Sequence, residues 1–374
     1  MLSFINESLS AWERLLQTRK PIVLYGMGNG ADKIVDWCEA NSVKIAGIFA
    51  SDEFVRGQSF RGFTVERYAD IISRLGEDIL IVIAFASERP EVLARFKELA
   101  EAHETLAPHL PLFDEPETVS LAWLEKYKVE LQKVYENLAD DVSRETFANV
   151  LNYKLSGKVE YLFACDTVRE EDLRQLFTFG ENEVYMDLGA YNGDTVQEFL
   201  NLTGGKYQHI IAVEPDRRNC KKLNAMAEAL GEITVHECGV WSEAGELGFS
   251  DSGGRQSTFL ATQKKTVPVN SIDDLAQGRA VSYIKMDVEG AEVQALEGGT
   301  KVIKEQAPKM FVAAYHYDVD VFRLPLLIWK LVPEYKIFFR KHPYVPAWEL
   351  NFLVTLITKQ RDAECSQQDK THCL

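Results

Sequence analysis

Residues 183–195 read EVYMDLGAYNGDT, and this stretch decides the fold of the second half of the chain. It begins with a short apolar run of strand-forming residues at 184–188, and Gly189 and Gly193 follow before a helical pattern starts at Thr195. A strand that turns through glycines into a helix lets the backbone approach a ligand and offers the free N–H groups of the first helical turn. We therefore predict a ligand-binding turn here.

Two acidic residues support this prediction. Asp187 stands at the end of the predicted strand, where it can bind a cationic or hydroxyl-rich group. Residues 209–213 (HIIAV) predict a second strand that ends at Glu214, 21 residues past Gly193. An acid at this position of a βαβ unit typically binds a ribose diol, as in NAD or S-adenosylmethionine (SAM). Asp194 in the turn disfavours a pyrophosphate and so favours the cationic SAM.

Composition limits the classes of function. Of the 374 residues 46% are hydrophobic and 26% charged, which is ordinary for a globular protein. The formal net charge of −16 disfavours binding to nucleic acid or to an anionic membrane, so we expect neither partner. The six cysteines contain no CxxC pair, which indicates reduced thiols without a disulfide framework. We expect a cytoplasmic protein, because the N-terminus has no basic start followed by an apolar core.

A second glycine-rich turn lies near the N-terminus, in PIVLYGMGNGA at residues 21–31. A predicted strand precedes this turn, and another strand at 44–50 is followed by Asp52. This GxGxxA pattern with a later acid is typical of a dinucleotide site. Three interpretations stay open: a purely structural turn, a nucleotide or nucleotide-sugar site, and an NAD site.

The order of the predicted elements indicates the fold class. From residue 184 onward strands alternate with helices, and the last two predicted strands, 335–339 and 352–357, are joined without a helix. This pattern predicts an α/β protein with a class I methyltransferase Rossmann-like sheet, parallel with an antiparallel terminal hairpin. A smaller Rossmann-like α/β domain and connecting helices precede it.

The predicted domain limits follow from changes in composition. We place a Rossmann-like nucleotide-binding-type domain at 1–113, a helical linker at 114–160, the methyltransferase domain at 161–358 and a polar tail at 359–374. The linker helices are a candidate surface for a homodimer.

Four sequence motifs follow one another in the second half of the chain. They are MDLGAYNGDT at 186–195, AVEPD at 212–216, SIDDL followed by YIKMDVEGAEVQALEGG at 271–299, and APKMFVAAYH at 307–316. Over roughly residues 163–357 the chain resembles the FkbM-type methyltransferase family. The resemblance implies a class I fold, SAM as methyl donor, and O-methylation of a hydroxyl on a sugar or natural-product-like small molecule.

The resemblance also implies site residues. It places the SAM contacts at Asp187, Gly189, Gly193, Asp194 and Glu214. It places a second set at the end of the fourth strand and just past the fifth, namely Lys285, Asp287, Glu289, Glu292 and His316.

Removal of the acceptor proton requires a general base or a solvent path. His316 is one candidate catalytic base and Asp287 or Glu289 is the other, while methyl transfer without a dedicated base stays open. Asp287 and Glu289 stand two residues apart at a strand end, and we expect them to face opposite sides. No metal ligand is predicted, because these residues lack a diagnostic spacing, although their types suit a divalent cation.

An alternative function belongs to a different class. The GxGxxA module would make the chain a nucleotide or nucleotide-sugar binding protein with a non-catalytic methyltransferase fold. The segments 250–265 and 322–344 are candidate determinants of the acceptor.

Overall fold

The computed structural model describes residues 2–113, 115–248 and 266–356. The acceptor segment 250–265 and the polar tail 359–374 lie outside these residues. Contacts divide the chain into two compact units. The first unit comprises residues 1–136, 140–168 and 339–350, and the second comprises 137–139, 169–338 and 351–374.

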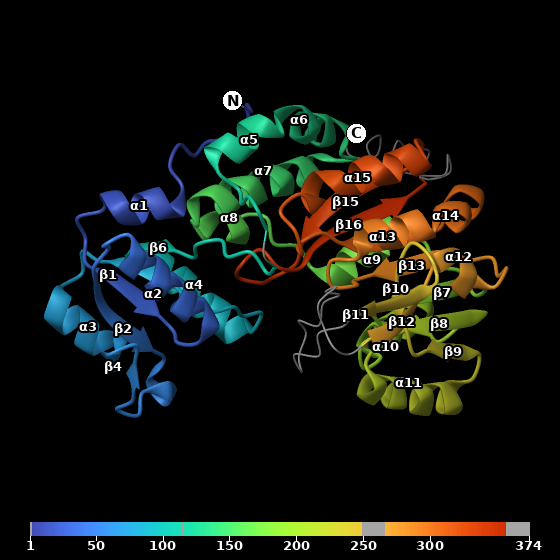
Figure 1. Cartoon of the computed structure of the whole chain (residues 1–374), viewed down its shortest axis with the longest axis horizontal. Helices are drawn as coiled ribbons and strands as arrows, with labels where there is room; N and C mark the ends of the chain where they lie inside the picture. The colour runs from blue at the N-terminus through green and yellow to red at the C-terminus, as the bar shows by residue number, and fades with distance from the viewer. Residues whose placement is uncertain (1, 114, 249–265, 357–374) are drawn as a thin grey trace, which may run out of the picture. The chain divides into compact units, whose positions relative to one another are not determined.

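The first unit is built on a six-stranded sheet in the order β3-β4-β2-β1-β5-β6 (Figure 1). Its strands are β1 (Ile22–Tyr25), β2 (Ile45–Ala50), β3 (Ser59–Phe60), β4 (Phe63–Arg67), β5 (Leu80–Ile83) and β6 (Glu104–Leu106). All neighbours are parallel except β3 and β4. β1 and β5 are buried along their whole length, which explains why their sequences are continuously apolar.

Helices complete the first unit. They are α1 (Ala11–Gln17), α2 (Asn29–Ala40), α3 (Tyr68–Leu75), α4 (Pro90–Ala102), α5 (Leu121–Lys126), α6 (Lys128–Asn137), α7 (Asp141–Ser156) and α8 (Glu160–Phe163), with a 3-10 turn η1 (Asp52–Phe54).

The helices predicted as a linker pack with the N-terminal residues. The Asn152 side chain on α7 donates to the carbonyl of Phe4 at 2.9 Å and accepts from the N–H of Asn6 at 2.7 Å. The N–H of Ala107 donates to the carbonyl of Gly157 at 2.7 Å. Contacts therefore assign α7 to the first unit, whereas the domain limits drawn from the sequence stay a prediction.

The second unit contains a seven-stranded sheet in the order β15-β16-β14-β13-β7-β8-β9. Its strands are β7 (Val184–Leu188), β8 (His209–Val213), β9 (Ile233–His236), β13 (Tyr283–Met286), β14 (Lys309–Ala313), β15 (Lys336–Lys341) and β16 (Leu350–Thr355). β9, β8, β7, β13 and β14 are parallel, and β16 runs antiparallel to β14. This order confirms the predicted class I methyltransferase fold.

The other elements of the second unit surround this sheet (Figure 1). The helices are α9 (Arg169–Leu176), α10 (Asp194–Thr203), α11 (Arg217–Leu230), α12 (Ile272–Ala276), α13 (Glu292–Gly298), α14 (Thr300–Gln306) and α15 (Asp320–Leu331). A small three-stranded sheet of β10 (Gly239–Val240), β12 (Thr266–Asn270) and β11 (Gly245–Gly248) was not predicted.

Strand order also locates the ligand edge. The chain moves outward from β7 to β8 and β9 and then returns to β13 on the other side of β7. In open α/β sheets ligands bind outside the carboxyl ends of the strands at such a reversal. We therefore expect a ligand-binding site at the carboxyl ends of β7 and β13.

An aromatic cluster holds one face of this sheet. Tyr185 stacks between Phe199 of α10 and Tyr283 of β13, with ring centroids 4.4 and 4.9 Å away. These rings are fully buried and fix α10 against the sheet.

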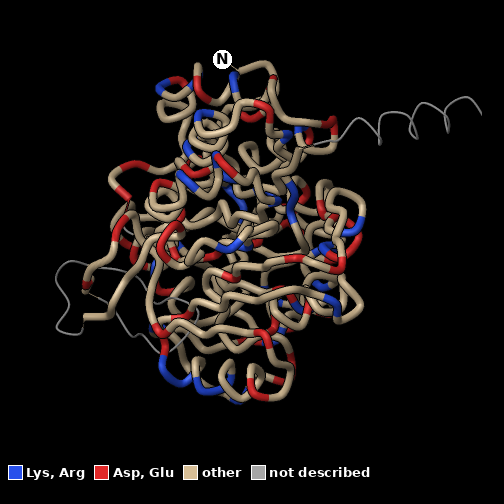
Figure 2. Tube along the Cα trace, turned by 90° about the vertical axis from the view of Figure 1, so that its right-hand side faces the viewer, with Lys and Arg blue, Asp and Glu red and all other residues tan. Residues whose placement is uncertain are grey.

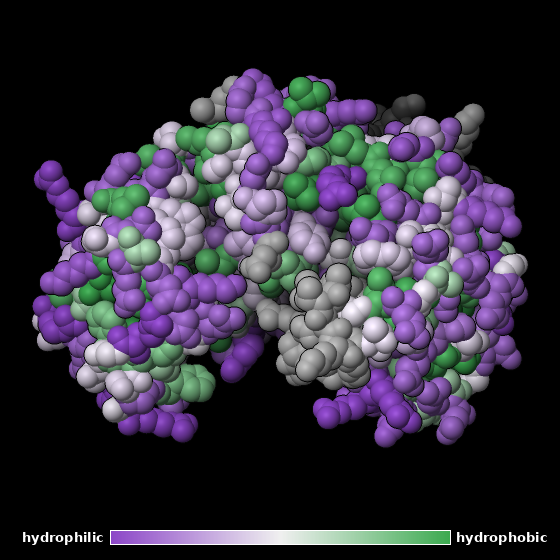
Figure 3. Space-filling view, viewed as in Figure 1, coloured by the Kyte–Doolittle hydropathy of each residue, from purple (hydrophilic) through white to green (hydrophobic). Residues whose placement is uncertain are grey.

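Over the described residues, no helix is both long and apolar enough to cross a membrane, and hydrophilic residues cover most of the face seen in Figure 3.

Candidate functional site

Asp187 lies at the end of β7 and is completely buried. Its Oδ2 accepts a hydrogen bond from the Thr195 hydroxyl at 2.5 Å, while its Oδ1 has no hydrogen-bond partner. The Lys285 ammonium on neighbouring β13 lies 3.5 Å from Oδ1. Burial raises the pKa of Asp187, and Lys285 and Thr195 offset this only in part. A buried carboxylate oxygen without a donor is suited to receive one from a ligand.

Lys285 has a role that the sequence left unassigned. Its ammonium donates to the carbonyl of Gly189 at 2.8 Å and so holds the glycine turn against β13. Burial disfavours its charged form, yet Asp187 and Asp287 outweigh this effect and raise the pKa of Lys285. Lys285 therefore stays a cation, and it links the turn to Asp187.

The turn requires glycine at position 189. Gly189 has a φ of +80°, and a Cβ there would lie 1.9 Å from the carbonyl oxygen of Asp287. The backbone of the turn thus touches the backbone after β13, which places the two predicted sets of residues side by side. Gly193 also has a positive φ and precedes α10, whose first residue is the predicted contact Asp194.

Glu214 follows β8 and is largely buried. Its Oε2 accepts from the N–H of Tyr191 in the glycine turn, and its Oε1 accepts from the N–H of Asp216, both at 2.9 Å. Burial raises the pKa of Glu214 despite these two donors. Each carboxylate oxygen retains acceptor capacity, because an oxygen can accept two hydrogen bonds.

The second predicted set gathers around His316, which follows β14 and is fully buried. His316 Nδ1 lies 3.0 Å from Glu292 Oε1, and its Nε2 lies 3.3 Å from Glu289 and 3.5 Å from Asp287. Burial lowers the pKa of an imidazole, but the three carboxylates outweigh it and raise the pKa of His316 well above its ordinary value.

Asp287 and Glu289 do not face opposite sides; that expectation was wrong, because residues i and i+2 of a strand lie on the same face. Both approach the same nitrogen of His316. The local backbone also departs from a strand: β13 already ends at Met286, and Glu289 adopts a left-handed φ of +55°. Non-glycine residues seldom adopt this conformation outside functional sites and tight turns. It turns the Glu289 side chain toward the imidazole.

Two neighbours of this cluster had no assigned role in the sequence. The Tyr315 hydroxyl donates to Asp287 at 3.2 Å. Asp320, the first residue of α15, is buried, and burial together with the charge of Glu292 raises its pKa to about 7. Asp320 stands only four residues after His316, and this short separation was the available signal for it.

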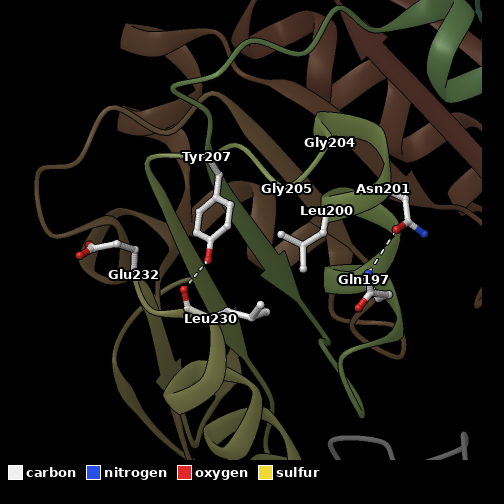
Figure 4. Close-up of a pocket in the computed structure, with 8 residues that line it drawn as sticks. All are labelled: Gln197, Leu200, Asn201, Gly204, Gly205, Tyr207, Leu230 and Glu232. Atoms are coloured by element: carbon white, nitrogen blue, oxygen red, sulfur yellow. Dashed lines mark hydrogen bonds between the residues drawn. The ribbon is translucent and has the colours of Figure 1, made fainter.

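A separate surface pocket of about 720 Å³ lies at the far end of α10 (Figure 4). Asn201, Gly204, Tyr207 and Leu230 line it, and Glu232 is its single carboxylate. The predicted residues flank the first turn of α10, whereas this pocket adjoins its last turn. This pocket is therefore separate from the predicted site, despite its size.

The glycine turn of the first unit is closed by side chains. A Cβ at Gly26 would lie 2.3 Å from the ring of Phe85, which packs edge-on against Tyr25 and Phe96. A Cβ at Gly30 would lie 2.5 Å from the carbonyl oxygen of Ala84. Two of the three glycines therefore have a packing reason, which favours the structural interpretation of this GxGxxA motif.

Comparison with solved structures shows the same fold over nearly the whole chain. A methyltransferase FkbM from Methylobacillus flagellatus KT has 21% sequence identity and a TM-score of 0.71, covering 92% of this chain and 94% of that one. A rRNA methylase from Streptococcus thermophilus covers 50% of this chain and 94% of its own, at 10% identity and a TM-score of 0.32. A precorrin-6y C5,15-methyltransferase from Geobacter metallireducens GS-15 covers 50% and 84%, at 12% identity and a TM-score of 0.31.

No curated protein matches the chain. The methyltransferase FkbM domain family matches residues 187–342, a range that begins at Asp187 and contains Glu214, the Asp287 segment and His316. These are the residues that the fold gathers at the carboxyl ends of its central strands. Residues 187–342, in the second half of this chain, therefore match the methyltransferase FkbM domain family.

Proposed function

We propose that the chain is a SAM-dependent methyltransferase that methylates a hydroxyl group on a sugar or natural-product-like small molecule. The observation that carries the proposal is the buried Asp187 carboxylate, whose Oδ1 has no hydrogen-bond partner beside a backbone turn. A cationic or hydroxyl-bearing ligand would satisfy this oxygen, and SAM carries both kinds of donor. The family match at 187–342 supports the same activity.

The residues of the turn fit an adenine riboside. Asp187 and Glu214 follow neighbouring parallel strands, so their carboxylates lie at the same edge of the sheet. Glu214 would accept from ribose hydroxyls, and Gly189 and Gly193 keep side chains away from the ligand. Asp194 begins α10, where its carboxylate adds negative charge near a cationic ligand.

SAM, held by Asp187, Glu214 and the glycine turn, would supply a methyl group on a cationic sulfur, and S-adenosylhomocysteine (SAH) would be its product after transfer to the acceptor oxygen. The protein must align the acceptor and receive its proton. Asp287 and Glu289 suit the second task, because their side chains are about one-third exposed, at 32% and 30%. His316 has no exposed side-chain surface, so we assign it a positioning role toward these two carboxylates.

A small-molecule acceptor is favoured over nucleic acid. The net charge is −16, and Figure 2 shows Lys and Arg interspersed with Asp and Glu on this side of the molecule. Such a surface lacks the electrostatic attraction on which phosphate-backbone binding depends. We also propose a cytoplasmic location, supported by the four free, buried cysteines among the described residues, Cys38, Cys165, Cys220 and Cys238.

Calorimetric titration of the purified chain with SAM and SAH tests the proposal. We expect one site per chain, with binding lost in Asp187→Ala and Glu214→Ala and retained in Glu181→Gln, a control at an exposed acid. Unchanged affinity in both alanine variants would sink the proposal. Parallel titrations with NAD and UDP-sugars test the alternative binding function, which requires a nucleotide to bind and Gly28→Val to abolish that binding.

A further inference from the structure

The cluster around His316 is rich in carboxyl groups. Four carboxylates surround one imidazole, from Asp287, Glu289, Glu292 and Asp320. Glu292 and Asp320 are almost completely inaccessible to solvent, at 1% and 2% exposure. Buried charges are costly unless an opposite charge compensates them. Even a protonated His316 supplies only one positive charge.

Possible ligand atoms of three of these residues lie close together. One ligand atom each from Asp287, Glu292 and His316 can be chosen so that all three lie within 4.8 Å of one another. Ligands on opposite sides of a cation that binds at about 2.0–2.4 Å are about 4–4.8 Å apart. The three side chains are thus close enough to share one ion.

A second, independent observation comes from Glu292 itself. Its Oε1 accepts the N–H of Val288 at 3.0 Å and faces His316 Nδ1. Its Oε2 is buried and has no hydrogen-bond partner. Leaving such an acceptor unsatisfied is destabilising, and more so for a charged group. A cation within the cluster would supply the missing partner.

We propose that Asp287, Glu292 and His316 bind a divalent cation of the Mg²⁺ and Mn²⁺ class. Two carboxylates and no thiolate indicate a hard cation, and the single imidazole favours Mn²⁺ over Mg²⁺. This goes beyond the sequence, which predicted no metal ligand. Asp287 lies at the solvent-exposed rim, so water or the acceptor hydroxyl can complete the coordination.

The cation would also serve the proposed methyl transfer, and this role alone rests on the proposed function. A hydroxyl bound to a divalent cation loses its proton more readily. Glu289, 3.3 Å from His316 and outside the ligand set, would then receive that proton. The buried ligands Glu292 and His316 would hold the ion, and the exposed rim would admit the acceptor.

The test uses the full chain after dialysis against EDTA, titrated with MnCl₂ alone and followed by electron paramagnetic resonance and calorimetry. We expect one saturable Mn²⁺ site per chain that Mg²⁺ displaces competitively. Glu292→Gln should weaken Mn²⁺ binding by about 10–100-fold, whereas Glu297→Gln, at an exposed position of the same helix α13, should not.

Asp287→Asn is a second test variant that should keep the fold, because the Asp287 side chain is partly exposed. It should weaken Mn²⁺ binding by about 10-fold. Absence of a saturable site, or Mn²⁺ affinity unchanged in both Glu292→Gln and Asp287→Asn, overturns the proposal in favour of a protonated His316 ion-paired with its carboxylates. SAM titration in EDTA separates the two proposals, since SAM binding without Mn²⁺ binding rejects only the metal site.

Discussion

The two edges of the seven-stranded sheet treat acidic residues in opposite ways. At the amino ends of the strands, Glu183 accepts from Lys309 at 2.8 and 3.0 Å, from the N–H of Gly180 at 2.7 Å and from the Ser282 hydroxyl. At the carboxyl ends, only four residues along the same segment, Asp187 keeps an oxygen without any hydrogen bond. The protein supplies every donor at the first edge, whereas the second edge keeps a buried acceptor without a hydrogen-bond partner.

The pKa values express this difference. Burial alone would raise the pKa of Glu183, but the bonds from Lys309, Ser282 and Gly180 outweigh it and lower that pKa. At Asp187 burial prevails and raises the pKa. Perturbation in the unfavourable direction is typical of functional sites, where stability is given up for binding. Burial by itself therefore does not distinguish a structural acid from a binding acid.

The largest expected effect belongs to Asp187→Asn. We expect SAM affinity to fall by about 100-fold or more, which corresponds to about 2.7 kcal/mol. The free energy of unfolding at pH 7 is measured alongside, because the substitution removes a carboxylate that burial disfavours but leaves the buried Lys285 ammonium without its counter-ion. Calorimetry and urea denaturation measure the two quantities. A variant that binds SAM normally would remove the contrast between the edges.

Glu183→Gln should lower the stability of the fold and leave SAM affinity nearly unchanged. It leaves the half-buried Lys309 without its counter-ion, so we expect the free energy of unfolding to fall by about 2–3 kcal/mol. SAM affinity should stay within about 2-fold of the unmodified chain, because the residue lies at the opposite edge. The same two measurements apply, and a large loss of SAM affinity in a folded protein would contradict the comparison.

The pH dependence of stability sharpens the role of Glu183. Its folded-state pKa lies below the ordinary value of 4.5, so its stabilisation is present above that pH and is lost as the pH falls through the folded-state pKa. We expect the difference in stability between the unmodified chain and Glu183→Gln to shrink below about pH 4.5. Urea denaturation between pH 3 and 7 measures it, and a constant difference would refute the assignment.

The smallest effect is expected for Thr195→Val. The substitution removes the hydroxyl that donates to Asp187 Oδ2 and keeps the shape of the side chain. We expect SAM affinity to fall by about 5-fold, or about 1 kcal/mol, because one hydrogen bond that orients the carboxylate is lost. Thr203→Val, at the other end of α10, is the matched control for calorimetry. Equal losses in both variants would point to a general effect on the helix.

The sequence predicted the parts of the site that depend on neighbouring residues. Strand, glycine turn and helix at 183–195 follow from local pattern, and Asp187 and Glu214 follow from the geometry of a βαβ unit. His316 and Asp287 could also be placed together, because parallel strands end at one edge of the sheet.

Other features depended on contacts that no local pattern encodes. Glu289 and Asp287 approach one imidazole nitrogen from a segment beyond the end of β13, where Glu289 adopts a left-handed φ that no strand pattern predicts. Phe85 closes over Gly26, so the glycine motif of the first unit looks like a nucleotide site in the sequence and packs like a core in the structure. Lys285 reaches back to Gly189 across 96 residues, a separation that spacing rules do not cover.

The assignment of residues 339–350 to the first unit bears on how the chain is made. Arg340 pairs with Asp140 at 2.6 Å, Lys341 pairs with Asp166, and Val345 exchanges two backbone hydrogen bonds with Ser87. During translation the later members of these pairs, Arg340, Lys341 and Val345, emerge from the ribosome more than 170 residues after Asp166. Domains usually complete their folding in the order of synthesis. Here the first unit is complete only after residues 339–350 have been made, and no single cut of the chain yields it whole.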